Sequence, residues 1–251
     1  MSQNLDSRAP AVPGERAPGS PPRPARGAGR KPFWRRPWLL PLALLLGAFL
    51  LWRVPAVVTL NPRAFPPVTL NPTEPLHHSV MLLHVACGTI AWITVCLQLS
   101  PWLRRKYPAV HRTSGRIYVF GGMIPAALLA IMLIPLSSWG PIAKAGMACW
   151  AVLSLGTTIT GLVMARQRRY GEHRRWMLYS FAMAMSVITG RLIAILVLQI
   201  PGAGPQIIAA THGELEGFWL GWLVNAALVF WWLRRTRKPR KTPAPQPANA
   251  G

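Results

Sequence analysis

The sequence predicts an all-α integral membrane protein, a polytopic transmembrane helix bundle of about six spans with both termini cytoplasmic. Most of the 28 Lys and Arg residues fall in four clusters, and long apolar stretches separate these clusters. The clusters are residues 8–36, 104–116, 166–175 and 234–241. Basic loops stay on the cytoplasmic side of a bilayer, whereas the loops on the other side carry few positive charges. Six spans and two cytoplasmic termini agree with each other.

Each predicted span is long enough to cross the hydrocarbon core, which takes about 20 apolar residues. Tryptophans near the predicted cytoplasmic ends, among them Trp34, Trp102 and Trp176, fit an aromatic belt at the membrane interface. The six spans are residues 38–58, 79–101, 115–136, 142–165, 176–200 and 213–233.

Two tails flank these spans. Residues 1–36 are rich in Pro, Gly, Ala and Arg, and residues 234–251 form a second basic, Pro-rich segment. Neither segment can bury enough apolar surface to offset the entropy lost on ordering, so we expect both to be disordered cytoplasmic tails. Residues 37–233 then form one six-span transmembrane domain.

The first span admits a second interpretation. Arg35 and Arg36 followed by a leucine-rich run also fit a signal peptide with a long leader. The apolar run continues to the length of a full span, interrupted mainly by Arg53, and no convincing small-x-small cleavage site follows. We therefore expect a retained anchor, with the stem of Arg53 reaching toward the headgroups.

The net charge of +22 raises the alternative of nucleic-acid binding. Hydrophobic residues make up 51% of the chain and charged residues 14%, and the charges largely avoid the apolar runs. The basic residues thus end lipid-length segments instead of covering one face of a soluble fold, which argues against a nucleic-acid partner. The lipid bilayer, with anionic headgroups at the basic loops, is the expected partner.

Polar side chains inside predicted spans are costly, so they indicate candidate functional sites. In the fifth span His173, Ser180 and Arg191 fall on one face at helical spacing, and Arg191 lies too deep for easy snorkelling. One interpretation is a packing face in which Glu214 or Glu216 neutralises Arg191. The other is a site where Arg191 binds an anionic group, such as a haem propionate or an acidic substrate.

Two further spans carry unusual residues. One face of the second span has small side chains around a histidine, which lets another helix or a flat cofactor approach closely. The members of this face are His84, Gly88, Ala91, Val95 and Gln98. The third span contains Gly121-Gly122 followed by Pro125, a combination that kinks or breaks helices at membrane depth.

The histidines fall at two depths of the predicted bundle. His111 and His173 lie at the cytoplasmic boundary, and His84 and His212 lie near the outer one. Paired imidazoles from different helices at two depths are what a membrane cytochrome with two b-type haems requires as axial ligands. The alternative is that His111 and His173, each followed by an arginine, are ordinary interface residues.

Histidines and carboxylates also gather on the predicted outer surface, at His77, His78, Glu214 and Glu216. Such mixed ligands suit zinc or another divalent metal. Their spacing matches no metal signature, so a protonatable cluster without metal is the alternative. The sequence has no P-loop, dinucleotide fingerprint, nucleophile elbow or HExxH motif, and it therefore assigns no enzymatic reaction.

Two predicted inner loops carry the most distinctive motifs. Residues 108–118 read Pro-x-x-His-Arg-x-x-Gly-Arg-x-Tyr, and residues 172–177 read Glu-His-Arg-Arg-Trp-Met. Together with His84 and Gln98 they resemble a family of predicted bacterial membrane proteins, domain of unknown function 2306, over about residues 77–200. The resemblance implies a multi-pass helical protein of the bacterial inner membrane, and it brings no known reaction.

Two hypotheses for function follow. The first is a membrane redox protein of b-type cytochrome character that binds haem b between helices. Its candidate cofactor-binding residues are His84, His212, His111, His173 and Arg191. The second is a transporter or binding protein for a small anionic substrate or lipid headgroup, which would use Arg191 and the His-Arg pairs of the two inner loops.

Overall fold

The computed structural model describes three stretches of the chain, residues 39–59, 74–198 and 219–236. Every regular element in these stretches is a helix, so the all-α class is confirmed for the described residues. The described stretches all belong to one compact unit, Arg36–Gly251. The first predicted tail and the second tail beyond residue 236 lie outside the described residues, and their disorder stays a prediction.

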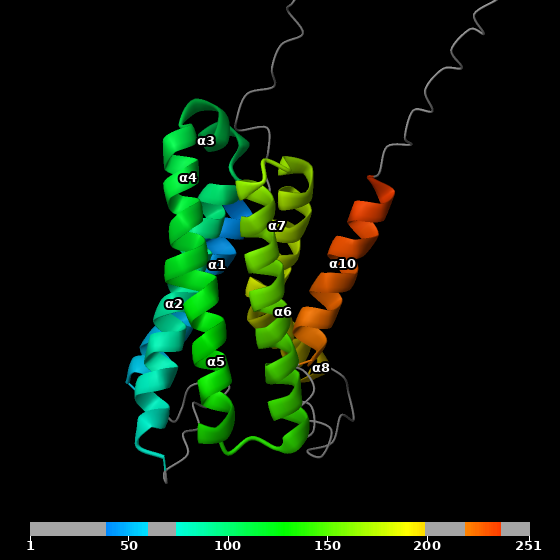
Figure 1. Ribbon diagram of the computed structural model, residues 1–251. Coiled ribbons are helices and arrows are strands. Elements are labelled where there is room, and N and C mark those ends of the chain that lie inside the picture. Colours follow the sequence, from blue (N-terminus) through cyan, green and yellow to red (C-terminus); the bar gives the residue numbers. More distant parts are fainter. Residues whose placement is uncertain (1–38, 60–73, 199–218, 237–251) are drawn as a thin grey trace, which may run out of the picture. The chain divides into compact units, whose positions relative to one another are not determined.

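The helices are best followed in chain order in Figure 1. They are α1 (Leu39–Val58), α2 (Leu76–Leu99), α3 (Pro101–Lys106), α4 (Pro108–Arg116), the π-helix η2 (Ile117–Met123), α5 (Ile124–Leu136), α6 (Pro141–Arg166), α7 (Tyr170–Ala184), α8 (Ser186–Leu198) and α10 (Gly221–Arg235). Because α4, η2 and α5 follow one another directly, Pro108–Leu136 forms a single span.

Four of the described helices are long and apolar enough to cross a membrane, or five if the bent pair α7–α8 counts as one span. The first four predicted spans therefore correspond to helices that can cross a bilayer. The sixth predicted span is described only from residue 219 onward, so the count of six stays a prediction. Helix α1 exposes Leu40, Leu44 and Leu51, the last of them 80% exposed, as a lipid-facing helix does.

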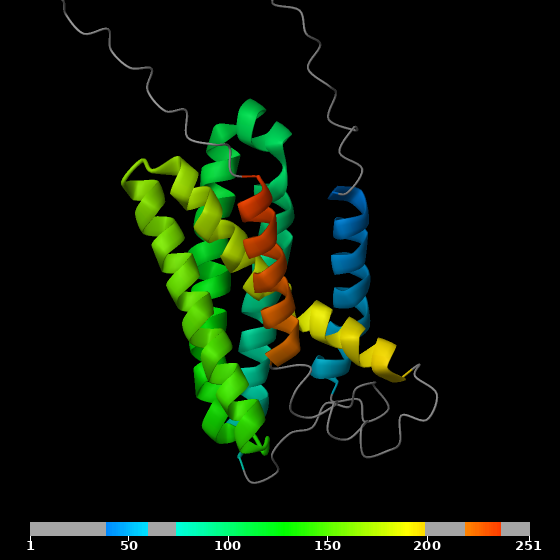
Figure 2. The ribbon, with the colours of Figure 1, turned by 90° about the vertical axis from the view of Figure 1, so that its right-hand side faces the viewer.

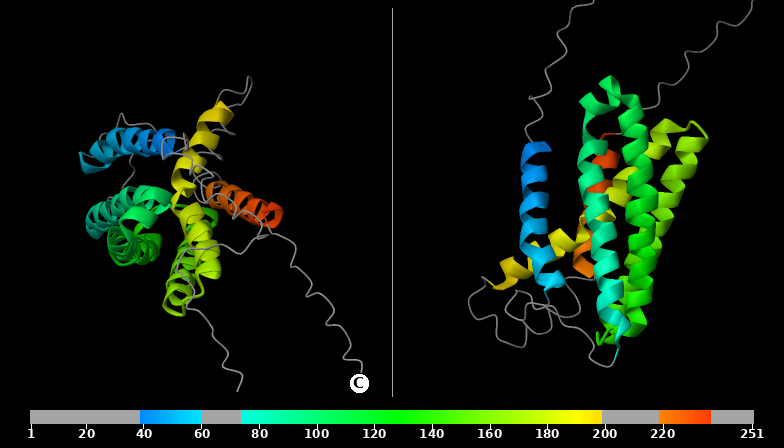
Figure 3. Two further views of the ribbon diagram at one scale, coloured as in Figure 1. Left: turned by 90° about the horizontal axis from the view of Figure 1, so that it is seen from above. Right: turned by 90° about the vertical axis from the view of Figure 1, so that its left-hand side faces the viewer.

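The bundle is built by neighbours in sequence that pack side by side. Helix α2 packs against η2 and α5, α5 packs against α6, and α6 packs against α7 along its length. Figure 3 shows these helices end-on and from the side opposite to Figure 2. The residues of three basic clusters that the structure describes lie at one end, at α3–α4, at the α6–α7 turn and at the end of α10 (Figure 1).

The small-residue face predicted for the second span contacts a neighbouring helix. A Cβ added to Gly122 of η2 would lie 2.9 Å from the Cα and Cβ atoms of Ala91, so only glycine permits this approach of η2 to α2. At the end of the same face, Gln98 donates hydrogen bonds to the Ser114 hydroxyl at 2.6 Å and to the His111 carbonyl at 2.8 Å. The face therefore holds α2 against α4, η2 and α5.

The helix break predicted in the third span lies instead in the fifth. Gly121 and Gly122 sit in the π-helix η2, whose widened turn is closed by a hydrogen bond from the Ile124 N–H to the Val119 carbonyl, and the span continues. Helices α7 and α8 instead meet at 45° around Met185, and Figure 2 shows α8 (yellow) running across the direction of α7.

This bend overturns the prediction of one straight polar stripe along the fifth span. His173 and Ser180 belong to α7, whereas Arg191 belongs to α8, beyond the bend. Helical spacing across Met185 therefore does not place the three side chains on one face, because the helix axis changes direction between them.

Candidate functional site

The two histidines predicted for the inner site lie in the first turns of helices. Pro108 occupies the first position of α4, where its missing N–H costs nothing, and α4 therefore begins before His111. Helix α7 likewise begins at Tyr170, before His173. Both residues were expected in loops that precede the spans. The helical start fixes the backbone from which each imidazole projects.

The structure places His111 and His173 within electrostatic range of each other. Both His173 and Arg104 lie near enough to His111 for their charges to act on its ring. His111 of α4 and His173 of α7 are 62 positions apart in the sequence, so their placement is a matter of tertiary structure. The two histidines of the predicted inner pair thus lie on two different helices, within electrostatic range of each other.

 The ring geometry of His173 fixes which nitrogen carries its proton. Nδ1 lies 2.8 Å from the carbonyl oxygen of Gly161 on α6. A carbonyl oxygen only accepts, so Nδ1–H is the donor, and a neutral ring keeps its lone pair on Nε2. On the other side of the pair, Nδ1 of His111 is buried and has no hydrogen-bond partner within the described part of the chain.

His84, the predicted outer ligand, carries its proton on the same ring nitrogen as His173, Nδ1. Its Nδ1 lies 2.9 Å from the carbonyl oxygen of Ala126 on α5, and its ring meets Trp150 of α6 edge-on, with centroids 6.2 Å apart. The neutral ring again leaves the lone pair on Nε2. Its predicted partner His212 lies outside the described residues, so the outer pair stays a prediction.

The remaining predicted residues reach only partly into the described structure. His77 is buried, and Nε2 of His78 lies 3.4 Å from the Val57 carbonyl. Within the described stretches, no three His, Cys, Asp or Glu side chains gather as a metal site would require. Glu214 and Glu216 lie outside the described residues. A metal site that includes them therefore stays a prediction, and so does their pairing with Arg191, which is half-buried in α8.

A chain of buried hydroxyl groups crosses the middle of the bundle. Ser180 of α7 lies 2.8 Å from the Tyr118 hydroxyl of η2 and 2.7 Å from the Thr158 hydroxyl of α6, and all three side chains are buried. Ser154, one turn from Thr158, is also fully buried, and its hydroxyl has no partner among the described residues. Of these residues the sequence singled out only Ser180 as a candidate, because which hydroxyls meet depends on the relative depths of three helices.

The break between α7 and α8 is held by donors from three other helices. The last carbonyls of α7 have lost their helical partners, and in a membrane such groups need replacements. The Trp92 indole N–H donates to the Ala184 carbonyl at 2.8 Å, and the Trp150 indole N–H donates to the Met183 carbonyl at 3.0 Å. The side-chain amide of Asn225 donates to the Ala182 carbonyl at 3.0 Å. Ser186 adds a local bond of 2.6 Å to Met183. Sequence reasoning assigned no role to Trp92, Trp150 or Asn225.

Long apolar helices, lipid-facing leucines and buried hydrogen bonds between helices define a multi-pass α-helical membrane protein. The chain belongs to the family described as "Predicted membrane protein (DUF2306)", whose model matches residues 81–233. The resemblance expected from the sequence is thus confirmed, and the match extends beyond the expected 77–200 to include the sixth predicted span. No curated protein and no solved structure matches the chain.

Proposed function

We propose that the protein is a membrane redox protein of b-type cytochrome character, with one haem held between His111 and His173. The observation that carries the proposal is that these two imidazoles, on separate helices, lie within electrostatic range of each other. Two imidazoles that approach from opposite sides are the axial ligands of a low-spin b-type haem. When bound, the haem iron exchanges one electron between its ferric and ferrous states.

The nitrogens of the pair suit this role. Ligand histidines commonly donate their second ring N–H to a carbonyl, which fixes the tautomer and orients the ring. The bond from His173 to the Gly161 carbonyl does this, and it leaves Nε2 as the nitrogen with a lone pair. The buried Nδ1 of His111 has no partner in the described structure, so the ring has no competing hydrogen bond there that would have to break. Arg104, within electrostatic range of His111, supplies a cation suited to a propionate.

A second haem at the outer level is the natural extension of this proposal. His84 has its Nδ1 tethered to the Ala126 carbonyl as a ligand histidine would, and His212 is its proposed partner. The tethers of His84 and His173 run to different helices, α5 and α6, so each ring is held independently. Loss of one site therefore should leave the other intact.

The transporter alternative receives no comparable support. Transporters with broken helices use unpaired backbone groups at the break to coordinate substrate or ions. At the α7–α8 break, the carbonyls of Ala182, Met183 and Ala184 already accept hydrogen bonds from side chains. A substrate at this break would have to displace those donors.

An absorption spectrum of the purified full-length protein tests the redox proposal. Protein from haem-replete cells should be red-brown, with a Soret band and a sharp α-band after reduction, as two imidazole ligands give. His111→Ala and His173→Ala should each remove the inner haem, whereas His78→Ala, which alters a histidine outside the proposed pairs, should leave the spectrum unchanged. Colourless protein from such cells would contradict the proposal. An unchanged haem content in both His111→Ala and His173→Ala would contradict it as well.

We further propose that the chain has six spans, with both termini in the cytoplasm of a bacterial cell and the spans in its inner membrane. Support comes from the basic residues of α3–α4, the α6–α7 turn and the end of α10, which lie at one end of the described bundle. Reporter fusions test this topology. A fluorescent protein should fold at either terminus, and alkaline phosphatase should be inactive there but active when inserted within residues 60–73. Phosphatase activity at only one of the two termini excludes an even number of spans.

A further inference from the structure

A groove opens between the ends of α7 and α10, on the same end of the bundle as the basic residues. Its volume is about 360 Å³, and side chains from the first turns of α7 and the last turns of α10 line it. This volume falls within the range of small-ligand sites. No histidine of the proposed haem sites lines the groove.

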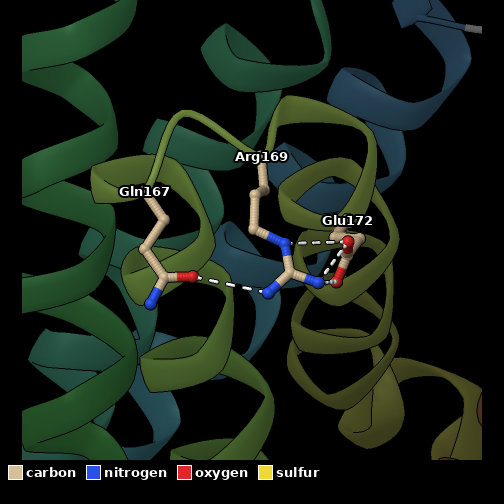
Figure 4. A network of polar contacts seen from close by, with 3 residues as sticks. All are labelled: Gln167, Arg169 and Glu172. Carbon is tan, nitrogen blue, oxygen red and sulfur yellow. Dashed lines mark hydrogen bonds and ion pairs between the residues drawn. The ribbon is translucent and has the colours of Figure 1, made fainter.

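Two arginines in the groove have no carboxylate partner among the described residues. Arg175 and Arg234 line it from opposite helices. The nearest acid in the groove is Glu172, but the guanidinium of Arg169 binds that carboxylate through Nε at 2.9 Å and through Nη2 at 2.6 Å (Figure 4). Glu74 is the other acidic residue that the structure describes, and it lies before α2. Within the described residues, therefore, no ion pair neutralises Arg175 or Arg234.

The rest of the groove is aromatic and apolar. Trp176 and Tyr179 contribute from α7, and Phe230 and Leu233 contribute from α10. The guanidinium of Arg234 stacks over the Phe230 ring, 4.4 Å from its centroid, which holds the charge above the apolar wall. Nearby, Arg174 of α7 lies over the Trp232 ring of α10 at 5.6 Å and links the two helices beside the groove.

We propose that this groove binds the phosphate headgroup of an anionic membrane phospholipid. Arg175 and Arg234 supply N–H donors in the planar arrangement that pairs with phosphate oxygens. The aromatic and leucine side chains beside them offer apolar surface to the glycerol backbone and the first methylenes of the acyl chains. The groove thus combines arginines with Trp and Tyr side chains. This is the combination of residues that meets lipid headgroups at a membrane interface.

A lipid fits better than a free phosphate ion for a physical reason. A free anion would use the two arginines alone and would leave Trp176, Tyr179 and Leu233 facing water. Anionic lipid satisfies both parts of the groove, and the bilayer presents it at high local concentration beside these helices. Phosphatidylcholine carries the same phosphate, but its choline cation offsets the charge and lies close to the arginines.

Native mass spectrometry of the full-length protein in detergent tests the proposal, with dioleoyl phosphatidylglycerol as the probe. Its first binding event should be tighter than that of dioleoyl phosphatidylcholine. The double variant Arg175→Gln/Arg234→Gln should weaken the first phosphatidylglycerol binding by about tenfold or more, because it removes charge-assisted hydrogen bonds. Arg175→Lys/Arg234→Lys, which keeps both charges but not the planar donors, should lose part of the affinity.

The control is Arg166→Gln/Arg168→Gln, which removes the same charge from exposed positions at the same end of the bundle, outside the groove. This control should bind phosphatidylglycerol as the parent protein does, and all three double variants should elute as folded protein. Equal losses in groove and control variants would overturn the proposal in favour of general charge attraction. Equal affinity for the two lipids overturns it as well. Displacement of phosphatidylglycerol by inorganic phosphate would assign the groove to the free ion instead.

Discussion

The indole N–H of Trp92, in the middle of α2, donates a hydrogen bond of 2.8 Å to the carbonyl oxygen of Ala184, the last residue of α7. Trp92 is 8% exposed, so little water reaches this bond. The Ala184 carbonyl has no helical partner because the chain turns at Met185. Trp92 and Ala184 are 92 positions apart in the sequence, so a residue of α2 stabilises the break between α7 and α8. No glycine or proline lies at Ala184, Met185 or Ser186.

Trp92→Phe should destabilise the bundle, because it leaves the Ala184 carbonyl buried without its side-chain donor. We expect the free energy of unfolding to fall by about 1–3 kcal/mol. Unfolding in mixed micelles with increasing denaturing detergent measures it. Trp52→Phe is the matched control: Trp52 is 45% exposed on α1, and its loss should change stability by less than about 0.5 kcal/mol. Equal effects of the two substitutions would contradict the role assigned to Trp92.

Gly122→Ala should also destabilise, by separating η2 from α2. The added Cβ would lie 2.9 Å from backbone and side-chain atoms of Ala91, which cannot swing away as the end of a long side chain can. We expect a cost of about 1–3 kcal/mol in the same unfolding assay. Gly88→Ala on α2 meets nothing within 4 Å and should be neutral or slightly stabilising. A neutral Gly122→Ala would show that the two helices do not approach this closely.

The Tyr118 and Ser180 hydroxyls should be energetically coupled. A double-mutant cycle with Tyr118→Phe and Ser180→Ala should give a coupling energy of about 0.5–1.5 kcal/mol, the size found for buried hydrogen bonds in membrane proteins. Thr158 keeps Ser180 partly satisfied in Tyr118→Phe, so the single substitution alone understates the contact. Tyr118→Phe combined with Thr236→Ala, at the exposed end of α10, should be additive. Additivity in both cycles argues against the hydroxyl chain.

Glu172→Gln should change stability very little, although it breaks the ion pair with Arg169. The two side chains are 41% and 53% exposed, and pairs of this kind contribute about 0–1 kcal/mol. Any loss should shrink as salt rises, because exposed charges are screened. Thermal unfolding at low and high salt measures both effects. A loss of several kcal/mol that persists at high salt would mean that the carboxylate has a buried structural role.

Much of the helical architecture was predictable because lipid imposes it locally. An apolar run of span length predicts a helix from composition alone, and α1, α2 and α6 begin and end within a few residues of expectation. The face of α2 that carries Ala91 and Gln98 was predictable too, since small residues at helical spacing mark close helix packing. The placement of His111 and His173 at the same end of the bundle followed from their position beside two basic clusters.

The rest depended on contacts between distant parts of the chain. Gly121, Gly122 and Pro125 are local signals for a break, but η2 accommodates them as a π-helix within one continuous span. The true break at Met185 has no such signal, because its stability comes from Trp92 and other donors on remote helices. A single sequence shows which residues are unusual. It does not show which of them meet.

The π-helix has a consequence for the angular register of the whole third span. Ser114, before η2, meets Gln98 of α2, whereas Ala126, after η2, meets His84 of the same helix. Deleting one residue within Ile117–Met123 would shift the later half of the span by about 100° around its axis relative to the earlier half. Only one of the two contacts could then survive. The extra residue in the widened turn therefore sets the rotation of the later half of the span, so that both halves can contact α2.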